Sequence, residues 1–392
     1  MAILAIQQIG RSRGQLESLK MVNILQFGGS VGTVNGVNTS AVDDMANLST
    51  GGMTINANYN QTITLNNPLT VNWSLSMASG TGVTIAGAGT GMLSIKGANA
   101  AWNWGGGTIN VYTVFSTPGG GGTITINGSD VTLNSTLVNN GTINWSSNNP
   151  QQGPGPNINL GTLGRLSNTG TFNIQTTSTE KINGQADSLF SNSGIVQKTG
   201  ANTTTINAGY SQARGSLTVN SGTLAFQQAF SAAGGSVVLN GGNISSVQSM
   251  TIGAPASLSG VGTVTVTNAM GLQNSGSVIP GVNGIPGTLT LVGNYTQKGS
   301  TGALVINIDS AGNFGIFNVQ GTATLTGQLN VNHNANYQPP EGTNLVFMTY
   351  TSVSGDFSTF NISNQGWTTP QGVMEFQPNK STTDYELDTV AI

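Results

Sequence analysis

The chain has 392 residues, of which 57 are glycine, none is cysteine and only 6% are charged, with a formal net charge of −3. The absence of cysteine excludes disulfides and thiolate metal sites, and the lack of any basic cluster argues against nucleic acid and anionic membranes as partners. No apolar run approaches the roughly 20 residues of a membrane span. Because disordered chains are usually rich in charge, this composition indicates a β protein with many turns.

Residues 1–50 differ from the rest of the chain and are predicted to form an N-terminal arm or cap. Ile3, Ala5 and Ile9 alternate as in a strand, whereas Leu16, Leu19 and Val22 have helical spacing, which predicts an arm and then a short helix. One more helical turn is expected over 43–48. Arg11 and Arg13 follow the apolar residues, which is the reverse of a secretory signal, so another export route and a missing signal both stay open.

Residues 51–275 repeat one pattern, in which a short run of alternating β-formers follows a polar turn. Several turns read Asn-x-Gly, as in Asn168–Gly170 and Asn192–Gly194. Successive turn glycines are 29 (141 to 170), 24 (170 to 194) and 21 (194 to 215) residues apart, the length of one coil of a β-solenoid. We therefore predict an all-β fold, a single-chain parallel β-solenoid (β-helix) with a short non-repeat N-terminal arm and a C-terminal capping β region.

The alternation also predicts which side chains face the core. One apolar side of a short run cannot be buried by that run alone, but stacked coils bury it. The side chains expected to point inward are Ile143, Phe172, Ile174, Leu217, Val219, Leu224, Val237, Leu239, Val264, Val266, Leu289 and Leu291.

Residues 276–392 hold longer apolar runs and a concentration of aromatic residues, and we predict that they form the end of the solenoid and its cap. The tail alternates from Asp384 to Asp388, with Tyr385 and Leu387 expected on the face opposite the three acids. A charged edge strand that blocks misassembly is the favoured interpretation of that tail, over a weak cation site.

Part of the chain resembles a known family. The stretches NSGSVIPGVNGIPGTLTLVGNYTQ, FNVQGTATLTGQLNV and TSVSGDF, with the upstream NSG and SGTL units, resemble bacterial autotransporter-passenger-like surface proteins over about 139–360. The resemblance implies a β-solenoid at the cell surface, where such proteins act as adhesins or matrix components. The membrane β-barrel that ends a complete autotransporter is not found after 360 in this sequence.

Some β-helices degrade polysaccharides, and such enzymes need paired or tripled carboxylates on one face of the solenoid. Glu180 and Asp187 are the closest pair of acids in the repeats, and we expect them to be solvated turn charges, Glu180 beside Lys181. His333, the only histidine, is expected to be a polar surface residue, because no triad can be assembled around it. We predict no catalytic residue, no metal site and no cofactor.

The favoured function is therefore that of a non-enzymatic, extracellular structural protein that assembles head to tail with copies of itself into a filament or surface layer. An adhesin that binds surface glycans is the alternative, and a polysaccharide-active enzyme is the third. The terminal segments are expected to mediate assembly by adding a strand to a neighbour, and folding back onto their own coil stack is the competing hypothesis. The assembly residues would be Ile3, Leu4, Ile6, Ile9, Tyr385, Leu387, Val390 and Ile392.

Overall fold

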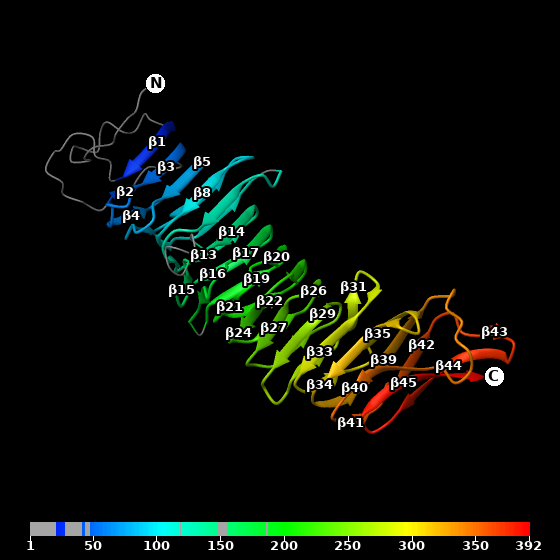
Figure 1. Cartoon of the computed structure of the whole chain (residues 1–392). Helices are drawn as coiled ribbons and strands as arrows, with labels where there is room; N and C mark the ends of the chain where they lie inside the picture. Colours follow the sequence, from blue (N-terminus) through cyan, green and yellow to red (C-terminus); the bar gives the residue numbers. More distant parts are fainter. Residues whose placement is uncertain (1–20, 28–40, 44–47, 118, 148–154, 186) are drawn as a thin grey trace, which may run out of the picture. The chain divides into compact units, whose positions relative to one another are not determined.

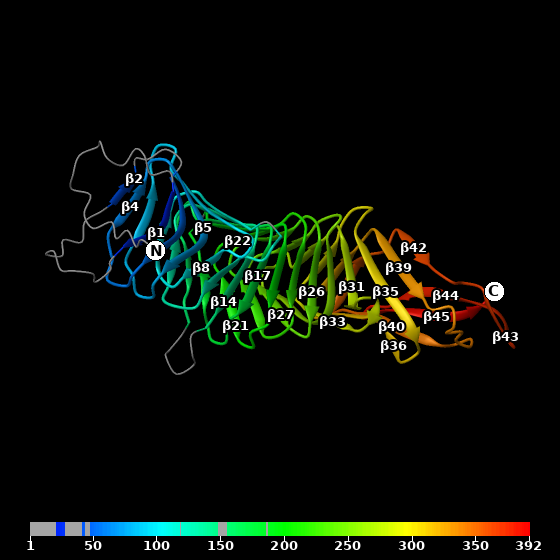
Figure 2. The same ribbon diagram turned by 90° about the horizontal axis from the view of Figure 1, so that it is seen from above.

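The computed structural model describes residues 21–27, 41–43, 48–117, 119–147, 155–185 and 187–392. The fold is all-β, a parallel β-solenoid of about 12 turns (49–333) followed by a C-terminal antiparallel region. The chain divides into two compact units, Met1–Gly209 and Tyr210–Ile392. In each unit, short strands of successive coils stack in parallel (Figures 1 and 2).

The strands of the first unit form three parallel ladders among the described residues. The first ladder consists of β7 (Met92–Lys96), β10 (Thr113–Ser116), β13 (Thr136–Asn139), β16 (Arg165–Asn168) and β19 (Leu189–Asn192). The second consists of β1 (Met21–Phe27), β3 (Leu48–Ile55), β5 (Pro68–Met77), β8 (Ala101–Trp104), β11 (Thr123–Ile126), β14 (Thr142–Ser146), β17 (Thr171–Gln175) and β20 (Ile195–Lys198). The third consists of β2 (Ala41–Asp43), β4 (Thr62–Leu65), β6 (Thr84–Gly87), β9 (Gly107–Asn110), β12 (Val131–Leu133), β15 (Ile158–Leu160), β18 (Lys181–Asn183) and β21 (Thr203–Ile206).

The described strands of the second unit also form three parallel ladders, two of which share β29. The first ladder consists of β22 (Gly209–Gln212), β25 (Phe230–Ala232), β28 (Met250–Ile252), β30 (Leu272–Asn274), β34 (Tyr295–Gln297), β38 (Thr322–Leu325) and β41 (Ser352–Gly355). The second consists of β23 (Ser216–Val219), β26 (Ser236–Asn240), β29 (Ser257–Val266), β31 (Ser277–Val282), β35 (Ala303–Ser310), β39 (Gln328–His333) and β42 (Thr359–Ile362). The third consists of β24 (Thr223–Phe226), β27 (Asn243–Ser246), β29, β33 (Thr288–Val292), β37 (Ile316–Val319) and β40 (Asn344–Thr349).

Antiparallel strands complete the second unit. β32 (Ile285–Pro286) folds back on β31, and β36 (Asn313–Phe314) folds back on β35. At the C-terminus, β45 (Asp384–Ala391) lies between β40 and β44 (Gly372–Lys380), and β43 (Trp367–Thr369) pairs with β44. This antiparallel region, β43–β45, is called the cap below (red in Figure 1).

The predicted core is confirmed. All twelve side chains expected to point inward are buried, each no more than 2% exposed. In β23, Leu217 and Val219 are buried while Ser216 and Thr218 are half-buried, as a period of two requires. Within the second unit, a ladder of buried aliphatic residues runs through one residue of each coil: Leu217, Val237, Leu258, Val278, Leu304 and Leu329.

The Asn-x-Gly turns have a physical cause in the stacking of coils. A Cβ atom on Gly194 would lie 2.1 Å from the carbonyl oxygen of Gly170, and one on Gly170 would lie 2.0 Å from that of Gly141. No side chain fits there, because the backbone of the preceding coil occupies the space. The asparagine two residues earlier turns inward, and its Oδ1 accepts a hydrogen bond from the N–H of the glycine, at 3.1 Å for both Gly141 and Gly194.

The predicted helices are not found in the part of the chain that the structure describes. β1, which begins at Met21, is extended and pairs in parallel with β3, so a helix over 16–22 is wrong at its last positions. Asp43 ends β2 and Leu48 begins β3. Pairing with the next coil outweighs the local helical spacing. Residues 1–20 and 44–47 lie outside the described residues.

Candidate functional sites

The terminal assembly residues have different surroundings. Ile3, Leu4, Ile6 and Ile9 lie outside the described residues. Tyr385 and Leu387 are buried, 2% and 0% exposed, Val390 is half-buried and Ile392 is 70% exposed. The expected alternation of the tail is present, with Asp384, Glu386 and Asp388 on the outer face of β45. The expectation of an edge strand is wrong, because β45 pairs with β40 on one side and β44 on the other.

The two buried tail residues pack against their own chain. The hydroxyl of Tyr385 donates a 2.9 Å hydrogen bond to Asp356, and its ring lies 5.4 Å from Phe347 and 5.3 Å from Phe357, between centroids. Burial and the nearby Asp356 carboxylate raise the pKa of Tyr385. In this fold residues 384–391 pair with β40 of their own coil stack, as the fold-back hypothesis expects for the C-terminal segment. Tyr385 and Leu387 are not exposed to a neighbour.

The last coil of the solenoid is covered on one of its three strands. β40 has β37 on one edge and β45 on the other. Among the described residues, β41 pairs only with β38, and β42 only with β39. The amides of Thr359 and Ser363 donate to Gly327 and Val331 in the preceding coil. By alternation, the Phe360 and Ile362 amides point to the opposite, open edge.

The buried aliphatic ladder that contains Leu217 also ends at this open edge. Leu329 is fully buried, and its register partner in the last coil is Phe360, which is 44% exposed. Ile362 follows Val331 in the same way and is half-buried. We call β41 and β42 with these two side chains the open edge. It exposes core positions as well as backbone groups.

Glu180 and Asp187 are not a pair of solvated turn charges. Asp187 is exposed, but Glu180 is only 1% exposed. Its carboxylate accepts hydrogen bonds from the hydroxyls of Ser147 and Ser178 and from the Gly155 N–H at 3.1 Å. Burial acts to raise the pKa of Glu180, yet these hydrogen bonds outweigh it and hold the pKa below its usual value. The expected solvation of Glu180 is wrong because hydrogen-bond donors of the protein take the place of water at its carboxylate oxygens.

A second buried charge, which was not expected from the sequence, lies near Glu180. Lys198 is fully buried and its ammonium donates a 2.7 Å hydrogen bond to the carbonyl oxygen of Gly200. Burial lowers the pKa of Lys198 to about 8, and the negative charge of Glu180 opposes the shift. The signal was available, since Lys198 stands two residues after the buried Val196 in the same strand. Neither charge lines either of the two hollows described below.

His333 is also buried, which corrects the expected surface position. It is 3% exposed and lies at the end of β39 against the cap, with ring centroids 5.0 Å from both Trp367 and Phe376. Its Nδ1 and Nε2 atoms face the backbone carbonyl oxygens of Asn364 and Tyr337. The surroundings of His333 are those of a packed residue that joins the solenoid to the cap.

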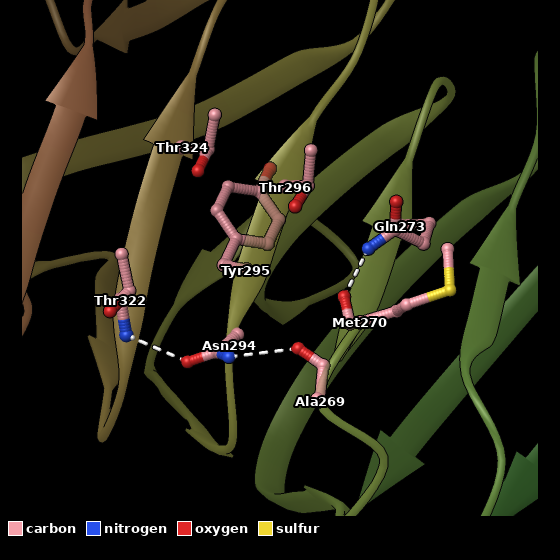
Figure 3. A pocket seen from close by; sticks show the side chains of 8 residues that line it. All are labelled: Ala269, Met270, Gln273, Asn294, Tyr295, Thr296, Thr322 and Thr324. Carbon is pink, nitrogen blue, oxygen red and sulfur yellow. Dashed lines mark hydrogen bonds between the residues drawn. The ribbon is translucent and has the colours of Figure 1, made fainter.

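One surface hollow of about 270 Å³ lies over β30, β34 and β38 (Figure 3). Gln273, Thr296 and Thr324 are register partners along its floor. Asn294 bridges its rim, donating to the Ala269 carbonyl oxygen at 2.9 Å and accepting from the Thr322 N–H at 3.0 Å. No Asp, Glu, Lys, Arg or His side chain lines this hollow, and its polar side chains are hydroxyls and amides.

A larger hollow of about 440 Å³ lies between the two hairpins, β31–β32 and β35–β36, and the end of β39. We call it the hairpin groove. The residues that line it are Gly284, Ile285, Pro286, Asn307, Ile308, Asp309, Asn313, Asn332, His333 and Asn334. Four of its polar side chains come from alternate positions of two neighbouring strands, Asn307 and Asp309 from β35, Asn332 from β39 and Asn334 from the residue after β39. Its one carboxylate, Asp309, accepts hydrogen bonds from Asn334 at 2.7 Å and Asn313 at 3.1 Å.

Over the described ranges, no group of three or more His, Cys, Asp or Glu side chains could hold a metal ion. The same residues contain no helix with the length and apolar character needed to cross a bilayer. No protein-family model and no curated protein sequence matches the chain.

Proposed function

We propose that this protein is a non-enzymatic structural protein of the bacterial cell surface that polymerises head to tail. The observation that supports this most directly is the open edge, where the core ladder ends on Phe360, 44% exposed, next to unpaired strand amides. Exposed strand edges pair readily with other chains unless they are blocked. The likeness of 139–360 to autotransporter-passenger-like proteins favours an extracellular location.

The occupant of the open edge is a second copy of this chain. Each coil of the solenoid is covered by a coil that continues the same parallel register and the same inward apolar positions. A copy supplies such a strand in its first coil, where β1 pairs in parallel with β3, and its preceding residues include the apolar Ile3, Leu4, Ile6 and Ile9. A contact between the last coil of one copy and the first coil of the next is heterologous, so it propagates into a filament.

A charged substitution at the open edge tests this proposal. Phe360→Lys places an ammonium at the exposed last position of the core ladder, and Val261→Lys is the matched control, because Val261 is 43% exposed on β29. We expect wild type and Val261→Lys to form filaments, and Phe360→Lys and a deletion of 1–15 to remain folded, β-rich monomers. Analytical ultracentrifugation, electron microscopy and circular dichroism measure these outcomes. A wild-type chain that stays monomeric at high concentration contradicts the proposal, as do filaments of Phe360→Lys.

The adhesin remains the second candidate, and the hairpin groove is the observation that favours it.

A further inference from the structure

The hairpin groove is built by features that leave the regular coil. The β31–β32 hairpin turns at Asn283 and Gly284, both with positive φ (52° and 81°), which suits a tight two-residue hairpin turn. The second hairpin, β35–β36, follows in the next coil, and its tip extends beyond the neighbouring strands (Figure 2). The groove therefore has two walls and a strand floor. Its volume of about 440 Å³ is within the usual size of small-ligand sites.

The floor of the groove holds four polar side chains in fixed positions. Asn307 and Asp309 are on β35. Asn332 is near the end of β39, and Asn334 directly follows that strand. Asn332 donates a 2.8 Å hydrogen bond to Asn307, and Asn334 donates one of 2.7 Å to Asp309. The spacing of such a grid is about 4.8 Å between strands and roughly 6.6 Å along each strand. These hydrogen bonds hold the side chains in place before any ligand arrives.

The grid still has hydrogen-bonding capacity to offer. In the described part of the chain, the Asn307 amide group has no acceptor for its N–H bonds, and the Asn332 Oδ1 has no donor. Each Asp309 oxygen accepts one hydrogen bond and has a lone pair left. Donors and acceptors thus alternate within one small area. A hydroxyl group, which donates and accepts at once, suits such an area better than a purely anionic or cationic ligand does.

One wall of the groove is apolar. Ile285, 68% exposed at the tip of the first hairpin, and Pro286 offer a surface for C–H groups. Asp309 is the one charged side chain that lines the groove, which disfavours phosphate, sulfate and other anions. From the polar floor and the apolar wall we infer that the hairpin groove binds a neutral saccharide, whose hydroxyls meet the grid and whose C–H face lies on Ile285.

The test uses the full-length chain and an array of neutral oligosaccharides, followed by calorimetry with the tightest ligand. Asp309→Ala and Asn332→Ala remove one member of the grid each. The control is Asn240→Ala, which removes an exposed asparagine bonded to Asn220 outside the groove, at 3.0 Å. We expect wild type and the control to bind the same sugar, and each groove variant to bind it about tenfold or more weakly.

Circular dichroism and melting curves establish that the variants are folded, and Asn332→Ala carries the test if Asp309→Ala does not fold. A titration with calcium chloride in the absence of sugar tests calcium as a competing ligand. The inference is overturned if no neutral oligosaccharide binds, if the groove variants bind like wild type, or if only calcium binds in a way that requires Asp309. Filament formation is tested separately with the Phe360→Lys variant, so either proposal can be contradicted without the other.

Discussion

The side-chain amide of Asn139 donates a 2.8 Å hydrogen bond to Oδ1 of Asn168, its register partner one coil further along the solenoid. Asn168 repeats the contact with Asn192 at 2.9 Å. All three residues are no more than 1% exposed, so the ladder is an internal polar seam. The sequence separations of 29 and 24 residues equal the predicted coil lengths.

The first prediction concerns this seam. Asn168→Ala removes the acceptor of Asn139 and donors to the Gly170 and Ile195 carbonyl oxygens, which lie at 3.2 and 3.0 Å. Buried polar groups left without partners cost about 1–3 kcal/mol each. We expect the free energy of unfolding of the first unit to fall by at least about 2 kcal/mol in urea titrations. The control is Asn144→Ala, which breaks a 2.8 Å ladder contact with Asn173 at a half-buried site and is expected to cost under about 1 kcal/mol. Equal losses would contradict an internal role for the seam.

The second prediction concerns the apolar core. Leu217 is fully buried above Val237, and Leu217→Ala leaves a cavity in a stack that cannot collapse without shifting a coil. We expect a loss of about 2–5 kcal/mol in the free energy of unfolding. Thr218→Ala, at the neighbouring half-buried position, should change it by less than about 1 kcal/mol. A mild effect of Leu217→Ala would show that the coil relaxes around the missing methyl groups.

These residues show what the sequence could predict. The inward position of Leu217 in an alternating strand and the spacing of the turn glycines are both properties of one repeated unit. The alternation and the repeat length were therefore enough to predict the fold class, the core and the coil length. Glu180 was misjudged and Lys198 overlooked because a charge is assumed to be solvated. The inward strand position buries Lys198, and donors such as the Gly155 N–H replace water at Glu180. His333 was misjudged for the same reason, since its aromatic neighbours Trp367 and Phe376 come from the cap.

The candidate sites were harder to predict than the fold. Phe360 was counted among the C-terminal aromatics, and only the register with Leu329 shows that it is the last member of a core ladder. The hairpin groove had a signal in Asn307-x-Asp309 and Asn332-x-Asn334, which occupy alternate positions of two strands. That signal is weak without the pairing of β35 with β39, because asparagine is common throughout the chain.

The third prediction concerns the pH dependence caused by Lys198. Its pKa is about 8 in the folded chain against 10.5 for an ordinary lysine. Between these values the unfolded chain binds a proton that the folded chain has lost, so the contribution of Lys198 to stability rises with pH from about 8 to 10.5. Below pH 8 both states are protonated, and the folded chain holds a buried ammonium with a single hydrogen bond. Lys198→Met should therefore raise the free energy of unfolding at pH 7 and abolish that rise.

Chemical denaturation at several pH values measures this effect as the difference between wild type and variant. Lys181→Met is the matched control, since Lys181 is an exposed lysine next to Glu180. We expect that control to follow the wild-type pH profile. A Lys198→Met variant less stable than wild type at pH 7 would mean that the ammonium stabilises Glu180 more than its own burial costs.

The last prediction concerns the attachment of the cap. The hydroxyl of Tyr350 donates to the carbonyl oxygens of Ser381 and Asp384, at 3.1 and 2.5 Å, and so ties the last coil to the start of β45. Burial, with the carboxylates of Asp384 and Asp356, raises the pKa of Tyr350 from 10.0 to about 12. Its contribution to stability is therefore complete below pH 10 and is lost as pH rises from 10 to about 12, because only the unfolded chain ionises easily in that range. Tyr350→Phe should lower stability at pH 7 by about 1 kcal/mol and flatten the alkaline loss. Hydrogen exchange of the β40 and β45 amides at pH 7 and in the alkaline range measures this stability. Tyr112→Phe, at an exposed tyrosine, is the control. An alkaline loss of the same size in Tyr350→Phe would assign it to another group, of which the buried Tyr385 is the nearest in the cap.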